Sequence, residues 1–224
     1  MQILEPSLKR RILLIDDHPL VREWLTTLID QQADLTICGE AEDAPHALQA
    51  IETLRPDAAV IDITLASGSG IELIKDIKRI APSVAIIVLS MHDEALYAER
   101  ALRAGAQGYL TKRQTAKKVV AAIRTVLEGG VFVSDALAAQ MAQRLIGSRS
   151  MSSLPTVSDL SDRELEVFEM FGRGLGTREI AGSLGISMKT VQVYCARIKE
   201  KLGLKSAQEL LREAVRWMDH RNQA

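Results

Sequence analysis

Four short apolar runs in the first half of the chain are each followed by a charged or hydroxyl side chain. The residues at these positions are Asp16 with Asp17, Asp62, Ser90 and Lys112. If the runs are parallel strands, their carboxyl ends meet at one edge of a sheet, which is where open α/β sheets bind ligands. Three carboxylates at one edge repel one another unless a cation lies among them, and carboxylate oxygens suit a hard ion. The pattern therefore predicts a Mg²⁺ site.

Asp62 is the best candidate nucleophile of this set. A carboxylate beside Mg²⁺ can attack phosphorus and form an aspartyl phosphate, while the metal and an ammonium group neutralise the transferred oxygens. Asp62 follows the third apolar run, which is central in a sheet of order 2-1-3-4-5, and Asp16 and Asp17 can hold the metal from the adjacent first strand. Lys112 and Ser90 are then placed to bind phosphoryl oxygens. Each residue alone could be a helix cap or a solvated lysine, so only the whole set indicates a site.

A second pattern, near the C-terminus, is typical of a helix that reads DNA. Four apolar residues recur at the spacing of one buried helical stripe, and they are Val191, Cys195, Ile198 and Leu202. Cys195 is accordingly predicted to be a core residue rather than a reactive thiol. The opposite face carries small, polar and basic residues, namely Lys189, Thr190, Gln192, Val193, Ala196, Lys199 and Lys201.

The chemistry of that face matches the grooves and backbone of DNA. Gln192 can pair with adenine and Val193 can contact a thymine methyl group, whereas the lysines and Thr190 suit phosphates. Residues 186–205 carry five lysines and arginines against one glutamate. A basic helix face is usually just solvated, but this one lies on the second helix of a predicted helix-turn-helix.

The elements that must position the carboxylates are visible as an alternation along the first 130 residues. Short apolar runs alternate with amphipathic stretches five times, which predicts a doubly wound α/β fold with a five-stranded parallel sheet. The strands are expected at 11–15, 35–40, 58–63, 85–90 and 107–110. The helices are expected at 19–31, 43–54, 70–80, 93–104 and 115–128.

The rest of the chain has helical patterns only. A helix is expected at 134–146, and the small and polar residues of 147–158 predict a flexible linker. Ser161 and Glu164 fit a capping box, and a helix-turn-helix and one last helix follow. The expected organisation is a first domain at 10–130, a linker helix and flexible linker at 131–158, and a small all-helical domain at 159–224.

Composition and charge indicate the class and the compartment of the protein but do not identify its partner. With 47% apolar and 25% charged residues, the chain has a globular composition, and its net charge of −1 identifies no partner. Cys38 and Cys195 match neither a metal-ligand spacing nor a disulfide framework, which favours a reducing compartment. The sequence has no long apolar span and its first residues lack a signal-peptide core. We therefore expect a cytoplasmic protein without membrane contact.

The segments LLIDDHPLVR, VIDITLASGSGIEL, IIVLSMHDE and GAQGYLTK resemble, in order and spacing, the motifs of the response-regulator receiver domain. The resemblance covers about residues 10–130. It implies that Asp62 is the phosphoacceptor, that Asp16 and Asp17 hold Mg²⁺, and that the backbone carbonyl of Thr64 is a further ligand.

The same resemblance implies a switch made of Ser90, which turns toward the phosphoryl group, and Tyr109, an aromatic that follows it inward. Packing at the strand edge is the alternative for Tyr109. Two positions depart from the pattern: Ala66 stands where Pro is common, and Arg113 follows the lysine where Pro or Asp is frequent. Neither removes a reactive group. His18 is interpreted as an ordinary residue at the start of the first helix.

The segment from Leu160 to Leu204 is similar to the LuxR-type DNA-binding domain, so the whole chain resembles response regulators of the NarL/FixJ type. This implies a transcription regulator that receives phosphate from a sensor histidine kinase and is not a turnover enzyme. Promoter DNA, a second copy of the chain and RNA polymerase are the further partners implied. The last helix, around Leu210, Leu211, Ala214 and Trp217, is expected to supply a dimer contact.

Two other hypotheses remain open at this point. An aspartate-nucleophile phosphatase would use the same carboxylates, but Asp62-Ile63-Thr64-Leu65 lacks a second acidic residue two positions on. Alternatively, the receiver could be a constitutive dimerisation module that works without phosphorylation. The complete acidic set argues against the second hypothesis.

Overall fold

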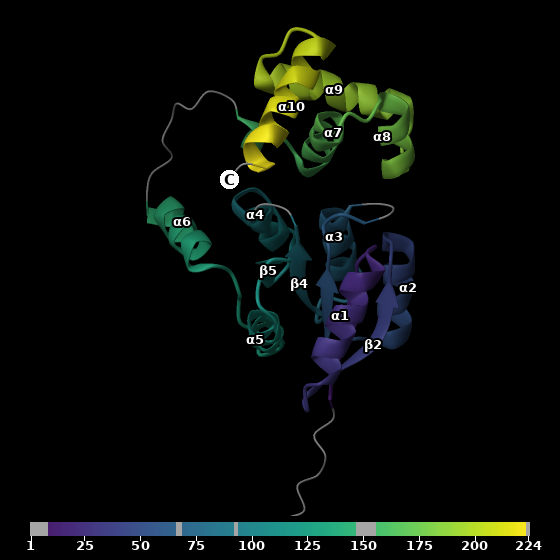
Figure 1. Ribbon diagram of the computed structural model, residues 1–224, viewed down its shortest axis with the longest axis vertical. Coiled ribbons are helices and arrows are strands. Elements are labelled where there is room, and N and C mark those ends of the chain that lie inside the picture. Colours follow the sequence, from purple (N-terminus) through teal and green to yellow (C-terminus); the bar gives the residue numbers. More distant parts are fainter. Residues whose placement is uncertain (1–8, 66–68, 92–93, 147–155, 223–224) are drawn as a thin grey trace, which may run out of the picture. The chain divides into compact units, whose positions relative to one another are not determined.

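A computed structural model describes residues 9–65, 69–91, 94–146 and 156–222 (Figure 1). The chain divides into two compact units, Met1–Gln140 and Met141–Ala224. Ala66 and most of the predicted flexible linker lie outside the described residues. Within the described part of the chain, no helix is long and apolar enough to cross a membrane.

The first unit is built on a five-stranded parallel sheet in the order β2-β1-β3-β4-β5, which confirms the predicted topology (Figure 1). The strands are β1 Arg10–Ile15, β2 Leu35–Ala41, β3 Ala58–Ile61, β4 Ala85–Ser90 and β5 Gly108–Thr111. β3 and β4 are buried along their whole length. Such continuous burial is characteristic of parallel sheets that helices cover on both faces.

Helices connect the strands and cover the sheet. They are α1 Pro19–Asp30, α2 Ala44–Leu54, α3 Gly70–Ile80, α4 Glu94–Ala104 and α5 Ala116–Leu127. One core cluster joins Leu25 and Ile29 of α1, Ile123 of α5, and alternate strand residues such as Leu14 and Val60. Since successive strand residues point to opposite faces, the other buried strand residues face α2, α3 and α4.

The strand register explains why distant carboxylates meet. β1 pairs with β3 so that Ile15 lies opposite Ile61, and Asp16 and Asp62 each follow directly. The backbone N–H of Asp62 donates to the carbonyl of Ile15 over 2.8 Å. On the other side, β4 and β5 pair Ser90 with Thr111, which places Lys112 just beyond. The four predicted site positions therefore lie at one edge of the sheet.

The second unit is all-helical, as predicted. After α6 Asp135–Ile146, within which the two units divide, come the short 3-10 helix η1 Val157–Asp159 and four further helices: α7 Asp162–Gly172, α8 Thr177–Leu184, α9 Met188–Leu202 and α10 Ala207–Asn222. Phe168, Ile180, Val191 and Ile198 form part of their buried core. Gly185 ends α8 in the left-handed conformation, which makes the tight turn into α9 possible.

Candidate functional site

The central feature of the sheet edge is a lysine held between two aspartates. Lys112 Nζ lies 2.6 Å from Asp16 Oδ2 and 2.7 Å from Asp62 Oδ2. The side chains of Asp16 and Asp62 are only 5% and 3% exposed. The structure thus brings together three of the predicted residues from β1, β3 and β5 in a largely dry environment.

The surroundings of Lys112 favour its protonated, positively charged form. Burial lowers the pKa of Lys112, but the negative charge of Asp62 and the hydrogen bonds to Asp16 and Asp62 outweigh that effect, and the pKa lies above its ordinary value. Lys112 is therefore an ammonium at neutral pH, as a group that neutralises phosphoryl oxygens must be.

Asp17 and His18 complete the cluster on the solvent side. Among the described residues, Asp17 Oδ1 has no hydrogen-bond partner although it is buried. His18 Nδ1 lies 2.7 Å from this oxygen, but the contact lacks hydrogen-bond geometry. A buried carboxylate oxygen without a hydrogen bond is costly, and a cation would compensate its charge. The donor set of Asp16, Asp17 and Asp62 therefore fits a hard divalent ion.

The loop after β3 keeps Asp62 in place. The Thr64 N–H lies 3.2 Å from Asp62 Oδ1, to which it donates a hydrogen bond, and the Gly70 N–H donates to the carbonyl of Ile63 over 2.9 Å. A side chain at Gly70 would bring its Cβ to 2.5 Å from the carbonyl oxygen of Asp62. The role of Gly70 was not predicted from the sequence; the small residues next to it, Ser67, Gly68 and Ser69, were the signal that could have pointed to it.

Ser90 and Tyr109, the predicted switch pair, are both buried in the receiver. Ser90 ends β4 and is fully buried, and its carbonyl accepts a hydrogen bond of 2.8 Å from the backbone N–H of Lys112. Tyr109 lies on β5 opposite Val88 and is 1% exposed. Both residues are thus on strands that lead directly to the carboxylate cluster. Arg113, the second departure from the receiver pattern, is exposed.

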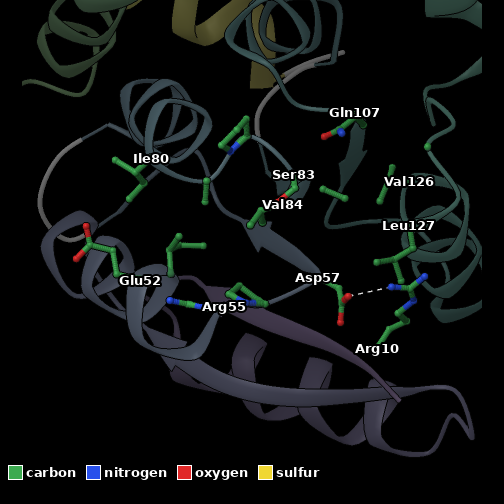
Figure 2. Close-up of a pocket in the computed structure, with 16 residues that line it drawn as sticks. Arg10, Glu52, Arg55, Asp57, Ile80, Ser83, Val84, Gln107, Val126 and Leu127 are labelled. Atoms are coloured by element: carbon green, nitrogen blue, oxygen red, sulfur yellow. Dashed lines mark hydrogen bonds and ion pairs between the residues drawn. The ribbon is translucent and has the colours of Figure 1, made fainter. Parts of the chain in front are cut away.

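A groove at the opposite edge of the sheet contains none of these residues. It has a volume of about 900 Å³ and lies where β3, β4 and β5 begin and where α2, α3 and α5 end (Figure 2). Arg10 forms an ion pair of 2.9 Å with Asp57 there. This groove is therefore separate from the carboxylate cluster, which lies at the carboxyl ends of the strands.

In the second unit, α9 has the predicted two-faced arrangement. Val191 and Ile198 are fully buried, and Cys195 is half-buried, with the pKa of its thiol raised by burial. Lys189, Gln192, Val193 and Ala196 are exposed, while Thr190 and Lys199 are half-buried.

The hydroxyl of Thr190 lies 2.8 Å from that of Ser187, which caps the helix. A cap of this kind fixes the start of α9, the end that enters the major groove in a helix-turn-helix.

Lys201 has a partner within its own unit. Its ammonium lies 2.7 Å from Glu164 Oε2 and 3.3 Å from the carbonyl of Asp159. Glu164 also caps α7 by accepting from the Ser161 N–H over 2.8 Å. Burial raises the pKa of Glu164, but the hydrogen bonds from Lys201 and Ser161 outweigh it and hold the pKa below its ordinary value. Lys201 thereby ties α9 to α7.

The last helix, α10, uses part of the residue set expected at the dimer contact in its own unit. Leu210 and Ala214 are buried against α7, and Trp217 packs edge-on against Phe168 with ring centroids 5.7 Å apart. These residues are used in the core of the unit, because they lie on the face of α10 that turns inward. Leu211, at 43% exposed, is the most open residue of the expected contact set, and Trp217 is half-buried.

The fold and the two sites define a receiver joined to a helix-turn-helix domain, and comparison with known proteins agrees. The family described as response regulator receiver domain matches residues 12–124, and that of bacterial regulatory proteins, luxR family, matches residues 158–214. The chain belongs to the NarL/FixJ family of response regulators, and it is a phosphorylation-controlled transcription regulator.

Relatives of known identity cover nearly the whole chain. The oxygen regulatory protein NreC of Staphylococcus epidermidis is 31% identical over 211 residues, which is 92% of this chain and 97% of that protein. The NreC protein of Staphylococcus aureus is 32% identical over 210 residues, with the same coverage of both chains.

Solved structures are similar to the whole chain or to part of it. RcsB from Salmonella enterica serovar Typhimurium, bound to promoter P1flhDC with the phosphomimetic BeF₃⁻, is 26% identical with a TM-score of 0.67, covering 92% of this chain and 98% of that one. A two-component response regulator of the LuxR family from Aurantimonas is 34% identical with a TM-score of 0.58, covering 62% of this chain and all of that one.

Proposed function

We propose that Asp62 accepts a phosphoryl group from a sensor histidine kinase and that this modification controls dimerisation and promoter binding. The observation that carries the proposal is the pair of contacts from Lys112 Nζ to Asp16 and Asp62, because they unite a nucleophile, a second carboxylate and an ammonium at one edge of the sheet. Such a constellation has the parts that phosphoryl transfer requires.

In the transfer, an oxygen of Asp62 attacks the phosphorus of a phosphohistidine, a P–O bond forms as the P–N bond breaks, and the leaving imidazole takes up a proton from water. Lys112 then turns its ammonium from Asp62 to a phosphoryl oxygen, while Mg²⁺ would compensate the charge of Asp16. Mg²⁺, held by Asp16, Asp17, Asp62 and the carbonyl of Thr64, would neutralise further negative charge on the phosphoryl group. Hydrolysis of the aspartyl phosphate by water, which resets the protein, is the one other reaction that we assign to the site.

Ser90 and Tyr109 would convert the new charge into a change of shape. Ser90 has a hydroxyl at the end of β4 that can bond to a phosphoryl oxygen, and Tyr109 lies on the adjacent strand. Movement of a fully buried serine alters the packing around it, and a buried aromatic ring follows such a change because interiors are densely packed.

DNA binding would use the exposed face of α9. Gln192, Val193 and Ala196 would face base edges, whereas Lys189, Thr190 and Lys199 would contact phosphates. For Lys201 the ion pair with Glu164 supports a different role, which is to hold α9 in its orientation on α7.

The remaining partners follow from this chemistry. A two-fold protein reads paired half-sites, so a homodimer is the DNA-bound form that we propose, with RNA polymerase as a further partner at the promoter. Leu211 and Val215, one helical turn apart and exposed on α10, are the residues that we assign to the dimer contact. The place of action is the cytoplasm, where promoter DNA is.

The test uses the full chain with Mg²⁺ and acetyl phosphate, followed by intact mass and by oligomeric state in the presence of beryllofluoride. We expect one phosphoryl group per chain and a shift to dimers, both lost in Asp62→Asn. Labelling that persists in Asp62→Asn would refute the assignment of the nucleophile. Continuous turnover of a generic phosphomonoester would favour the phosphatase hypothesis instead.

A further inference from the structure

We propose that His18 is a fourth ligand of the metal site and that it makes the site selective for a first-row transition ion such as Mn²⁺ over Mg²⁺. The inference rests on the proposed function, since it concerns the same carboxylates. It adds a nitrogen donor to a site that the sequence predicts to be made of oxygen alone, and it gives a role to a residue that the sequence had marked as ordinary.

The positions of the ligand atoms carry the proposal. Asp16, Asp17, His18 and Asp62 each offer one atom, and these atoms all lie within 4.8 Å of one another. His18 Nδ1 is 2.7 Å from Asp17 Oδ1 and forms a hydrogen bond of 3.2 Å with Asp16 Oδ1, so a bound ion would take the place of a proton on this nitrogen. Adjacent ligands of an octahedral ion with bonds of about 2.1 Å are about 3 Å apart. The two measured distances bracket that separation.

The carboxylate oxygens that Lys112 does not contact are the ones that could bind such an ion. Lys112 contacts Oδ2 of Asp16 and Oδ2 of Asp62, so the ammonium lies on one side of the cluster. The Oδ1 atoms of Asp16 and Asp17 are the ones that face His18, and Asp17 Oδ1 is buried without a hydrogen bond among the described residues. The imidazole nitrogen thus lies at the oxygen that most needs a cation.

The backbone around His18 holds the ring at the cluster, where its contacts are with Asp16 and Asp17. The His18 N–H donates to Asp16 Oδ1 over 2.9 Å, and the residue is extended, with φ −93° and ψ 107°, just before Pro19. It occupies the N-cap of α1, yet its side chain makes no capping hydrogen bond. Removal of the imidazole therefore costs no cap, and the fold should tolerate a substitution here.

An imidazole ligand raises the affinity of the site for some ions more than for others. Mg²⁺ prefers oxygen donors and retains water, whereas imidazole suits transition ions, whose affinity for nitrogen sites rises along the first row from Mn²⁺. A site with two or three carboxylate oxygens and one imidazole therefore binds Mg²⁺ through the carboxylates and gains an additional bond with Mn²⁺. The ring is 61% exposed, so solvent and a phosphoryl oxygen can reach the remaining positions.

The experiment loads the full chain with Mn²⁺ and records pulsed electron paramagnetic resonance, in which a directly bound imidazole nitrogen gives a characteristic ¹⁴N coupling. We expect this coupling in the wild type and its loss in His18→Ala. His46→Ala is the matched control, because His46 also lies 2.7 Å from an aspartate, Asp43, but outside the cluster. It should keep the coupling.

Affinities measured by titration provide the second readout. His18→Ala should lower Mn²⁺ affinity about tenfold and change Mg²⁺ affinity less than about threefold, while Asp17→Asn should weaken both ions. Mn²⁺ binding without nitrogen coupling, or equal losses for both ions in His18→Ala, would overturn the role of His18 and leave the proposed function intact. If neither ion binds the wild type, the metal site of the proposed function fails as well.

Discussion

At the scale of single residues, the mechanism that we propose gives Lys112 two roles, one before and one during phosphoryl transfer. Before phosphorylation it offsets the charges of Asp16 and Asp62, two carboxylates that are almost fully buried. During the proposed transfer it would bind phosphoryl oxygens. An ammonium suits both tasks because it is a compact point charge on a flexible stem, whereas arginine would fix one bidentate geometry.

Replacement of Lys112 by methionine should destabilise the receiver by about 3 kcal/mol at neutral pH, because two buried carboxylates lose their shared cation. Mg²⁺ should restore most of this loss, since it would take over the compensation of charge. Urea unfolding with and without Mg²⁺ measures both effects, and the exposed Lys118→Met serves as control. Unfolding curves that coincide with the wild type in the absence of Mg²⁺ would contradict the structure.

Glu164 predicts a pH dependence in the second unit. Its pKa is held below the ordinary value of 4.5, so its contribution to stability is complete above about pH 4.5 and is lost as the pH falls through the lower, folded-state pKa. Glu164→Gln should cost about 2 kcal/mol near pH 7 and should flatten the loss of stability in acid. Trp217 fluorescence in a Trp24→Phe background reports this unit alone, because Trp217 packs on Phe168.

Glu179→Gln is the comparison for that measurement. Glu179 also accepts a hydrogen bond at a helix start, 2.7 Å from the Gly176 N–H, but its side chain is exposed. We expect a smaller effect at neutral pH, because water replaces the lost hydrogen bond. Equal effects of the two substitutions would mean that the Lys201 ion pair contributes nothing beyond the cap.

At the scale of elements, α9 carries two kinds of lysine, which should contribute differently to the salt dependence of DNA binding. Lys189 is exposed near the start of the helix, whereas Lys201 is paired with Glu164. Lys189→Gln should weaken binding to every duplex and reduce the slope of log affinity against log salt by about 0.9, the contribution of one phosphate contact. Lys201→Gln should leave that slope unchanged and lower the unfolding free energy of the domain.

The binding measurement needs only a duplex of mixed sequence and a second one selected for tight binding. Gln192→Ala should lose about 1–3 kcal/mol on the selected duplex and little on the mixed one, because a side chain that pairs with a base edge contributes to specificity. A reduced slope in Lys201→Gln would show that this lysine leaves Glu164 for a phosphate on the DNA.

The elements themselves could largely be predicted from sequence periodicity, whereas several contacts could not. Apolar runs of strand length with a carboxylate at the end place Asp16 and Asp62 at one edge once the sheet order is assumed. The partner of Lys201 is 37 residues away in another helix, and no local pattern connects them. The buried face of α10 could not be predicted from the sequence either. Apolar residues such as Leu210 and Leu211 are adjacent in sequence, and only packing decides which one is buried.

At the scale of the whole molecule, each unit has its own core. The second unit buries residues of α7, α8, α9 and α10 against one another, and the α7–α10 pair is its most extensive packing. A unit with a complete core can fold alone, so the receiver is not needed to form the DNA-binding surface. Control by the receiver must then act on how many such surfaces engage DNA together, or on their access to it.

A fragment of residues 156–224 separates these two modes of control. If the receiver acts through dimerisation, as we propose, the fragment should bind DNA weakly, with the affinity of the unphosphorylated full chain, and beryllofluoride should tighten only the full chain, by tenfold or more, because linked domains raise the effective concentration of the second site. If the receiver instead blocks α9, the fragment should bind as tightly as the activated full chain. Titration of a duplex with two half-sites, repeated with one half-site, distinguishes the outcomes, since the gain from dimerisation disappears when only one half-site is present.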